Sequence, residues 1–228
     1  TAKSPAENNC GGTNAENGAT GATCAAVVKV VNSTDYSLLI DASTDTTSAS
    51  QSGETVNVDF ELTEAHVGHI LQVGFKNYAG NYAPTGMLYD NADVSAYTPE
   101  PTPEPTPEPT PEPTPEPTPE PTPAPSVTFA DDYEGYADAA DLAPWLYSVS
   151  QFDADGNYSN NYNGTAVKDN MTGLVDDNGN TLLNTYSNYG DDTHGSGFVE
   201  VNIIRELGVN QGYITSDMIG TYRFSVTD

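Results

Sequence analysis

The sequence predicts an all-β protein, an antiparallel β-sandwich of the jelly-roll type that is interrupted by a proline-rich linker. Three observations predict it: short stretches in which apolar residues alternate with polar ones, turn clusters rich in Gly, Asn and Asp between them, and a Thr-Pro-Glu-Pro repeat over 98–125. Alternation with period two gives a strand one buried face and one solvated face. We therefore expect two β-rich blocks, 1–97 and 126–228, on either side of the linker.

Both blocks contain clearly alternating stretches. In the first block, residues 56–62 and 71–75 alternate Val, Leu and Phe with other residues. In the second block, residues 199–203 and 222–226 do the same. Turn clusters such as 153–157 separate these stretches. About eleven strands fit the pattern, which is compatible with a jelly-roll sandwich.

The linker contains 14 of the 17 prolines of the chain. Alternate prolines fix φ and remove backbone donors, so the segment favours extended polyproline II over helix or sheet. At about 3.1 Å per residue, its length corresponds to a semi-rigid spacer of roughly 85 Å. Its threonines lie between prolines and are candidate O-glycosylation sites: Thr102, Thr106, Thr110, Thr114 and Thr118.

The composition excludes several classes of protein. Lys and Arg number 6 against 33 Asp and Glu, a formal net charge of −27. Nucleic-acid binding depends on Lys and Arg that neutralise phosphates, so a nucleic-acid partner is not expected. No apolar run approaches the roughly 20 residues of a membrane helix, so membrane insertion is not expected either. Such an acidic surface keeps copies soluble and attracts divalent cations.

The two cysteines, Cys10 and Cys24, flank a loop rich in Gly, Asn and Thr. A disulfide across this loop would stabilise the fold by about 3 kcal/mol. Two free, buried thiols are the alternative. We favour the disulfide, and with it an oxidising location: secreted, extracellular, at the cell surface. The sequence starts without the features of a signal peptide, so an export signal is removed or lies outside it.

Each block alone is about 100 residues long with few aliphatic side chains, which makes a marginal core. We therefore expect the blocks to be complementary halves of one sandwich. Motifs support this when the chain is read from 126 to 228 and then from 1 to 97: Asp131-Asp132-Tyr133-Glu134 followed by Trp145, Leu182 to Tyr189, Gly220 to Ser225 running into Ala2-Lys3, Gly68 to Phe75, and Gly86 to Asn91.

In that order the chain resembles one copy of a secreted bacterial repeat module, a carbohydrate-binding-module-like jelly roll from polysaccharide-degrading bacteria. The resemblance implies a β-sandwich and a polysaccharide as a possible partner. It also implies that 126–228 is the N-terminal half of the module and 1–97 its C-terminal half. The permuted order has two explanations: the chain is one period of a long array of modules, or its halves complete modules with neighbouring copies. Both predict that copies of the chain join head to tail.

Catalytic motifs are missing from the sequence. It has no Gly-x-Ser-x-Gly elbow, no His-Glu-x-x-His and no Cys/His cluster. His66 and His69 would need a third metal ligand that the sequence does not indicate. With 33 acidic residues, a glycosidase pair cannot be singled out. We therefore predict a protein that is not an enzyme and has no catalytic residues.

Acidic residues near the two ends of the permuted module indicate a possible structural calcium site. The expected opening strand carries Asp131, Asp132 and Glu134, and the expected closing strand carries Asp90 and Asn91. In a jelly roll these two strands tend to be neighbours. Oxygen ligands from adjacent strands suit Ca²⁺. Ordinary solvated turn residues are the alternative. The loop 153–157 is a weaker second candidate, because its glycine does not match the EF-hand spacing.

Aromatic residues in Asn-rich segments indicate a possible carbohydrate site, since Tyr and Trp rings pack on sugar rings. The candidates are Tyr158, Asn161, Tyr162, Trp145 and Tyr189. Trp145 lies in an apolar stretch and is expected in the core more than on the surface. Asn and Tyr loops are also ordinary turn chemistry.

Two functions are consistent with these features. The first is a non-catalytic extracellular structural repeat unit, a β-sandwich on stiff spacers that assembles head to tail into a fibre or adhesin stalk. The second is a carbohydrate-binding module of a secreted polysaccharide-degrading enzyme. We favour the structural repeat unit, because both the split sandwich and the stiff spacer support it.

Overall fold

The computed structural model describes most of the two blocks on either side of the linker. The described residues are 2–3, 10, 23–50, 52–80, 85–99, 127–136, 142, 145–153, 158–162, 172–187, 197–210 and 212–227. Within them the fold is all-β, with three antiparallel sheets, which confirms the predicted fold class of an all-β sandwich. No helix in this part of the chain has the length and apolar character needed to cross a membrane.

The strands of the three sheets lie in the following spatial order. The large sheet is β10 (Tyr158–Tyr162), β9 (Leu146–Asp153), β13 (Gly197–Leu207), β5 (Ile70–Gly80), β2 (Thr23–Val31) and β3 (Leu38–Asp45). The interleaved sheet is β4 (Val56–Leu62), β14 (Gly220–Val226), β7 (Ala92–Ala96) and β8 (Phe129–Asp131). The small sheet is β1 (Ala2–Lys3), β6 (Thr85–Tyr89), β12 (Asn180–Ser187) and β11 (Thr172–Asp177). Two short 3-10 turns, η1 (Glu64–His66) and η3 (Ser216–Met218), connect strands.

The alternating stretches of the sequence lie in strands, as predicted, and β4 and β14 bury one face each. Along β4, every second side chain from Val56 to Leu62 is buried and those between are exposed. Along β14, Tyr222, Phe224 and Val226 are fully buried. The other two predicted stretches lie within β5 and β13. Period-two alternation thus marks the strands whose one face meets the core.

A single aromatic cluster joins the three sheets in the core. The ring of Phe75, on β5, stacks on Tyr89 of β6 with centroids 3.7 Å apart. It also lies 5.9 Å from Phe224 of β14 and 5.9 Å from Trp145, which precedes β9. Because one ring contacts a residue from each of the other two sheets, the three sheets share one core.

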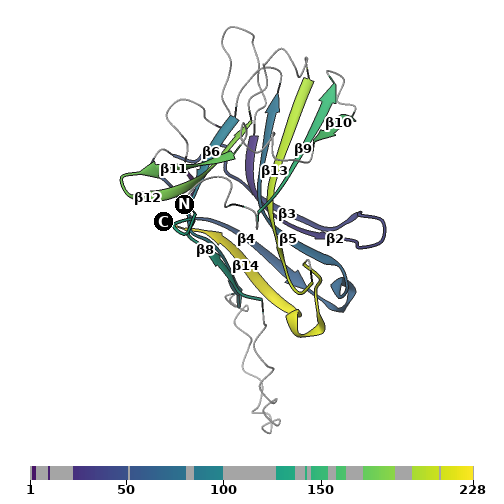
Figure 1. Ribbon diagram of the computed structural model, residues 1–228. Coiled ribbons are helices and arrows are strands. Elements are labelled where there is room, and N and C mark those ends of the chain that lie inside the picture. Colours follow the sequence, from purple (N-terminus) through teal and green to yellow (C-terminus); the bar gives the residue numbers. More distant parts are fainter. Residues whose placement is uncertain are drawn as a thin grey trace, which may run out of the picture.

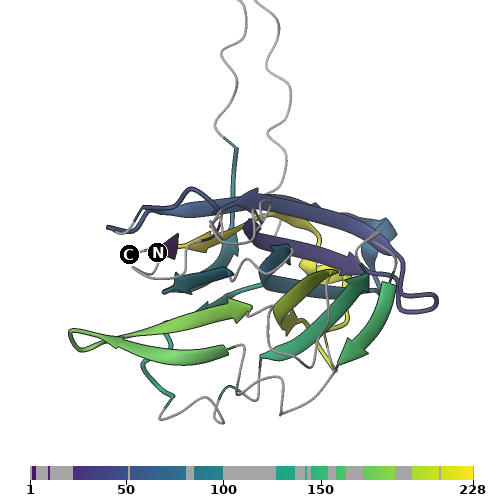
Figure 2. The same ribbon diagram turned by 90° about the horizontal axis from the view of Figure 1, so that it is seen from above.

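Every sheet contains strands from both sides of the linker (Figure 1). In the large sheet, β13 pairs with β5 over ten residue pairs, from Phe198↔Gly80 to Leu207↔Leu71. In the small sheet, β12 pairs with β6. The β11–β12 hairpin (green) extends sideways from the rest of the molecule in both views (Figures 1 and 2). The blocks 1–97 and 126–228 therefore do not form separate sheets in this structure.

Candidate functional site

The interleaved sheet is the most unusual feature of the fold, because its strands alternate between the two sides of the linker. β4 and β7 precede the linker, and β14 and β8 follow it. β14 lies between β4 and β7 and pairs with both, so that Phe224 is opposite Val58 on one side and Val94 on the other. Every neighbouring pair in this sheet thus joins residues from opposite sides of the linker.

Side chains on the core face of β14 complete this junction. The ring of Tyr222 stacks on Phe60 of β4, with centroids 5.5 Å apart. Its hydroxyl donates a hydrogen bond to the carbonyl of Met218 at 2.8 Å, so the buried polar atom is satisfied. Phe224 is fully buried and reaches the Phe75 ring. β14 therefore supplies the part of the core that faces β4 and β7.

The solvent face of β14 carries a second set of contacts. The Arg223 guanidinium donates hydrogen bonds to both carboxylate oxygens of Asp59 on β4, from Nε to Oδ1 at 2.6 Å and from Nη2 to Oδ2 at 2.9 Å. It also lies 3.7 Å from the centre of the Tyr97 ring, a cation–π contact. The hydrogen bonds from Arg223 lower the pKa of the Asp59 carboxyl, so this carboxyl stays ionised.

The end of β7 is anchored just before the linker begins. The backbone N–H of Tyr97 donates to the carbonyl of Thr221 at 2.9 Å. On the far side of the linker, Val127 is buried, and β8 then pairs with β7 through Val94↔Phe129. Directly opposite residues in an antiparallel pair have Cα atoms about 4.5–5.5 Å apart. The described structure therefore holds the segments that flank the linker close together.

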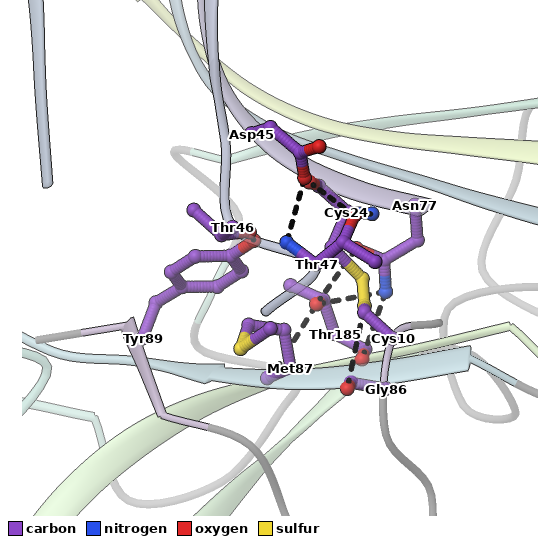
Figure 3. Close-up of a disulfide and its surroundings, with 10 residues drawn as sticks. All are labelled: Cys10, Cys24, Asp45, Thr46, Thr47, Asn77, Gly86, Met87, Tyr89 and Thr185. Atoms are coloured by element: carbon purple, nitrogen blue, oxygen red, sulfur yellow. Dashed lines mark hydrogen bonds between the residues drawn. A yellow bond between two sulfur atoms is a disulfide. The ribbon is translucent and has the colours of Figure 1, made fainter. Parts of the chain in front are cut away.

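A buried polar pair links the small and large sheets across the same division. Asn77 of β5 donates through Nδ2 to the carbonyl and hydroxyl oxygens of Thr185 of β12, at 3.0 and 2.9 Å. The Thr185 hydroxyl is also 3.1 Å from the carbonyl of Met87. Both side chains are 1% exposed, so their mutual hydrogen bonds offset the cost of burial (Figure 3).

A pocket of about 820 Å³ opens beside β8. Its walls combine the aromatic rings of Phe129 and Tyr136, the guanidinium of Arg205 and several acidic residues, among them Asp93 and Asp132. The Arg205 guanidinium lies 5.8 Å from the centre of the Phe129 ring. The volume falls within the usual range of small-molecule pockets.

The Asp131 carboxylate organises the floor of this pocket. It accepts hydrogen bonds from the Tyr136 hydroxyl at 2.6 Å, from Trp145 Nε1 at 2.9 Å and from the Tyr133 backbone N–H at 3.0 Å. Burial, together with the bond to Asp131, raises the pKa of Tyr136 to about 12, so its hydroxyl stays protonated as a donor. The buried Tyr133 hydroxyl has no hydrogen-bond partner among the described residues.

The predicted carbohydrate residues do not form a described site. Trp145 is only 1% exposed, and its ring packs among Phe75, Phe129 and Tyr133. Trp145 thus lies in the core, the placement expected from the apolar stretch around it, and its ring is not exposed as a surface for a sugar. The backbone of β10 contains Tyr158, Asn161 and Tyr162, whose side chains lie outside the described residues, as does all of Tyr189.

The predicted calcium residues have other partners. Asp90 is 2% exposed, and its carboxylate accepts hydrogen bonds from the Asn91 N–H at 2.8 Å and from Asn180 Nδ2 at 2.7 Å. Asn180 lies at the turn of the β11–β12 hairpin. Asp90 therefore contacts that hairpin from the β6–β7 junction.

Glu134 contacts the same hairpin. Its carboxylate accepts from the Thr181 N–H at 2.6 Å and from the Thr181 hydroxyl at 3.1 Å, while Asp132 accepts from the Glu134 N–H at 3.2 Å. Among the described residues, no three His, Cys, Asp or Glu side chains are grouped so that they could hold a metal ion. The calcium site at Asp90, Asp132 and Glu134 stays a prediction. The second candidate, 153–157, lies mostly outside the described residues.

The predicted disulfide between Cys10 and Cys24 is present, and both residues are buried (Figure 3). Cys24 begins the buried face of β2, and its backbone N–H donates to the Thr47 hydroxyl at 3.1 Å. The bond fastens Cys10 to the start of β2, which lies between β5 and β3 in the large sheet. The linker threonines proposed for O-glycosylation, from Thr102 to Thr118, lie outside the described residues.

Sequence reasoning missed two features of the site. Asp131 belongs to a motif that was noticed, but nothing in its spacing indicates that Trp145 and Tyr136 share its carboxylate. The Arg223–Asp59 pair was also missed, although Arg223 is one of only 6 basic residues and lies in the middle of an alternating strand. A rare cation on the polar face of a predicted strand is the signal that could have found it.

Comparison with known proteins gives no match: no family model, no curated protein and no solved structure is significantly similar to this chain. What the structure defines is therefore the class, an all-β sandwich whose sheets combine both flanks of a linker. The likeness to bacterial carbohydrate-binding-module-like repeats stays a prediction from the sequence.

Proposed function

We propose that this protein is a non-catalytic extracellular structural repeat unit that assembles head to tail into a filament or adhesin stalk. In such an assembly, residues 126–228 of one copy and 1–97 of the next form each sandwich, and the linker spans the distance between sandwiches. The observation that supports this most is the alternating strand order of the interleaved sheet, β4, β14, β7 and β8. A sheet with this order requires both halves, whichever copies supply them.

The linker favours pairing between copies. When one copy closes on itself, 28 residues with alternate prolines must bring their ends back to the β7–β8 pair. Polyproline II resists this, because it extends by about 3.1 Å per residue and is stiff over several residues. Pairing with another copy makes the same strand contacts and leaves the spacer extended. A head-to-tail contact of this kind adds copy after copy into a filament, unless the rotation between copies closes the assembly into a ring.

Extracellular location is supported by the Cys10–Cys24 disulfide, since disulfides persist in oxidising compartments. A secreted fibre would also expose the linker threonines to glycosylation. The net charge of −27 disfavours unspecific association between copies, so contacts are restricted to those with matched strands.

The test is light scattering coupled to size exclusion, with negative-stain electron microscopy of the same fractions. We expect species larger than the 24.1 kDa monomer that grow with concentration, and threads with a regular repeat. A monodisperse 24.1 kDa monomer at all concentrations up to the millimolar range would contradict the proposal.

A carbohydrate-binding module is the second candidate, and the pocket beside β8 favours it. Phe129 and Tyr136 offer partly exposed rings, and Arg205, Asp93 and Asp132 offer groups that bond sugar hydroxyls. Affinity electrophoresis through gels that contain plant or algal polysaccharides tests it. Retention that is lost on Arg205→Ala and kept on Lys76→Ala would identify this pocket. Retention lost instead on joint Tyr158→Ala and Tyr162→Ala substitution would locate binding on β10.

A further inference from the structure

β14 fills a slot between two strands that precede the linker. The slot is the space between β4 and β7, which pair with β14 and, within the described residues, not with each other. We propose that β14 is a donor strand, and that it inserts in trans into the slot of a second copy of this chain. This rests on the head-to-tail assembly proposed above, and adds that β14 completes the interleaved sheet of each joint, beside the β13–β5 and β12–β6 pairs.

The core face of the slot requires large apolar side chains at alternate positions. Tyr222, Phe224 and Val226 are each fully buried there. Opposite them the slot presents buried Phe60, Val58 and Val56 on β4 and buried Val94 and Ala92 on β7. Without β14, these apolar side chains and the facing edges of β4 and β7 would lose their cover. An uncovered edge of this kind is a template for another strand.

The solvent face of the slot fixes the register of the inserted strand. Arg223 binds Asp59 with two hydrogen bonds, and the Ser225 hydroxyl is 2.8 Å from Asn57 Oδ1. A shift by one residue would turn Phe224 outward and bring Arg223 into the core, because side chains alternate between faces. The side chains of β14 match those of the slot on both the core face and the solvent face. They therefore select a β14 strand, in this proposal that of another copy, as the partner.

Insertion in cis and in trans makes the same contacts in the slot. The difference lies in the linker, which joins β7 of the slot to β8 of the half that carries β14. In cis the linker must return to its starting point, whereas in trans it is free to extend. High protein concentration favours trans insertion, because it offsets the entropy lost on association.

The experiment uses two full-length variants with opposite charge changes on the solvent face. Asp59→Arg alters the slot, and Arg223→Asp alters the donor strand. Each variant alone places like charges across its own β4–β14 pair, while every joint between the two variants restores an Arg–Asp pair. The core residues of the slot are unchanged, so both variants are expected to fold.

The variants carry different affinity tags, are unfolded together, refolded at equal amounts and captured through one tag. In the control, each variant is mixed with a differently tagged form of itself. We expect the untargeted tag to be recovered from the mixture of the two variants at several times its level in this control. A matched charge reversal outside the slot, at exposed Asp41 (Asp41→Arg), should give no such preference. Recovery no higher than in the self-mixed control would overturn the donor-strand proposal.

A second pair of variants tests the core face and guards against weak effects from exposed charges. Phe224→Asp disables the donor strand, and Val58→Asp disables the slot directly opposite it. Each variant alone should lack a cooperative thermal transition, and an equimolar mixture should regain one together with a 1:1 complex in native mass spectrometry. A mixture that behaves as the sum of its parts would count against exchange.

These outcomes separate the donor-strand inference from the proposed function. If the two variants pair with each other but form only closed dimers, without threads in electron microscopy, the donor-strand proposal is supported and the filament proposal is contradicted. Threads formed equally by Phe224→Asp alone would uphold a filament and contradict the donor strand.

Discussion

Replacing the linker with Gly/Ser residues of equal length should shift the protein from assemblies to closed monomers. As extended polyproline II, residues 98–125 span roughly 85 Å, whereas 28 Gly/Ser residues have an r.m.s. end-to-end distance of roughly 30 Å. The structure requires the ends to meet within the β7–β8 pair. The flexible linker is therefore the one that closes at low cost.

The size of the shift follows from the two lengths. The effective concentration of one linker end at the other falls with about the cube of the r.m.s. distance, when that distance exceeds the gap to be closed. A reduction from roughly 85 to roughly 30 Å raises it by about 20-fold for flexible chains, and the stiffness of polyproline II adds to this factor. The concentration at which half of the protein is assembled should rise by at least about 20-fold.

Light scattering over a dilution series after refolding measures this concentration for each linker. The matched control replaces the six linker glutamates with glutamine, which removes charge and keeps the prolines. This control should assemble like the natural chain or more readily, because repulsion between spacers is reduced. The reasoning is refuted if the Gly/Ser chain and the natural chain assemble at the same concentration.

Three further predictions concern stability. Phe224→Ala should lower the free energy of unfolding by about 3–5 kcal/mol, the range for a buried Phe truncated in a core, and denaturant titration measures it. Asp59→Asn should cost about 0.2–1 kcal/mol at pH 7, because the pair with Arg223 is partly exposed. The pKa of Asp59 is lowered by folding, so its contribution is present above the unfolded pKa of about 3.9 and is lost as the pH falls through the folded value. Natural chain and variant should therefore converge in stability in acid, and an equal difference at pH 7 and pH 2 would contradict this. Reduction of the Cys10–Cys24 disulfide should cost about 3 kcal/mol, seen as a lower thermal midpoint with reductant, and an unchanged midpoint would contradict a stabilising role.

Local patterns in the sequence were sufficient to locate strands but not to pair them. β4 and β14 were evident because each has alternate apolar side chains that reach the core. Alternation carries no information about which strand lies beside which, so the insertion of β14 between β4 and β7 could not be read from it. That order depends on contacts between residues far apart in the sequence, such as Arg223 with Asp59, which are 164 positions apart.

The candidate sites show the same division between local and long-range information. The opening and closing strands were expected to be neighbours, and β8 does pair with β7. The hydrogen-bond partners of the acidic side chains around these strands depend on which donors from distant parts of the chain lie beside them. Asp90 binds Asn180, and Asp131 binds Trp145, so both carboxylates already have partners within the protein. The ligand chemistry of an acidic residue is thus decided by its three-dimensional neighbours.

The meeting of both linker ends at the β7–β8 pair determines how a filament of these units would carry tension. Each sandwich would receive one spacer at β8 and release the next at β7, at the same end of the molecule. A pull along the thread would then act on this corner alone and leave the large sheet unloaded. The sandwiches would then project sideways from the thread, with β10 and the β11–β12 hairpin away from it and the pocket beside the point of attachment.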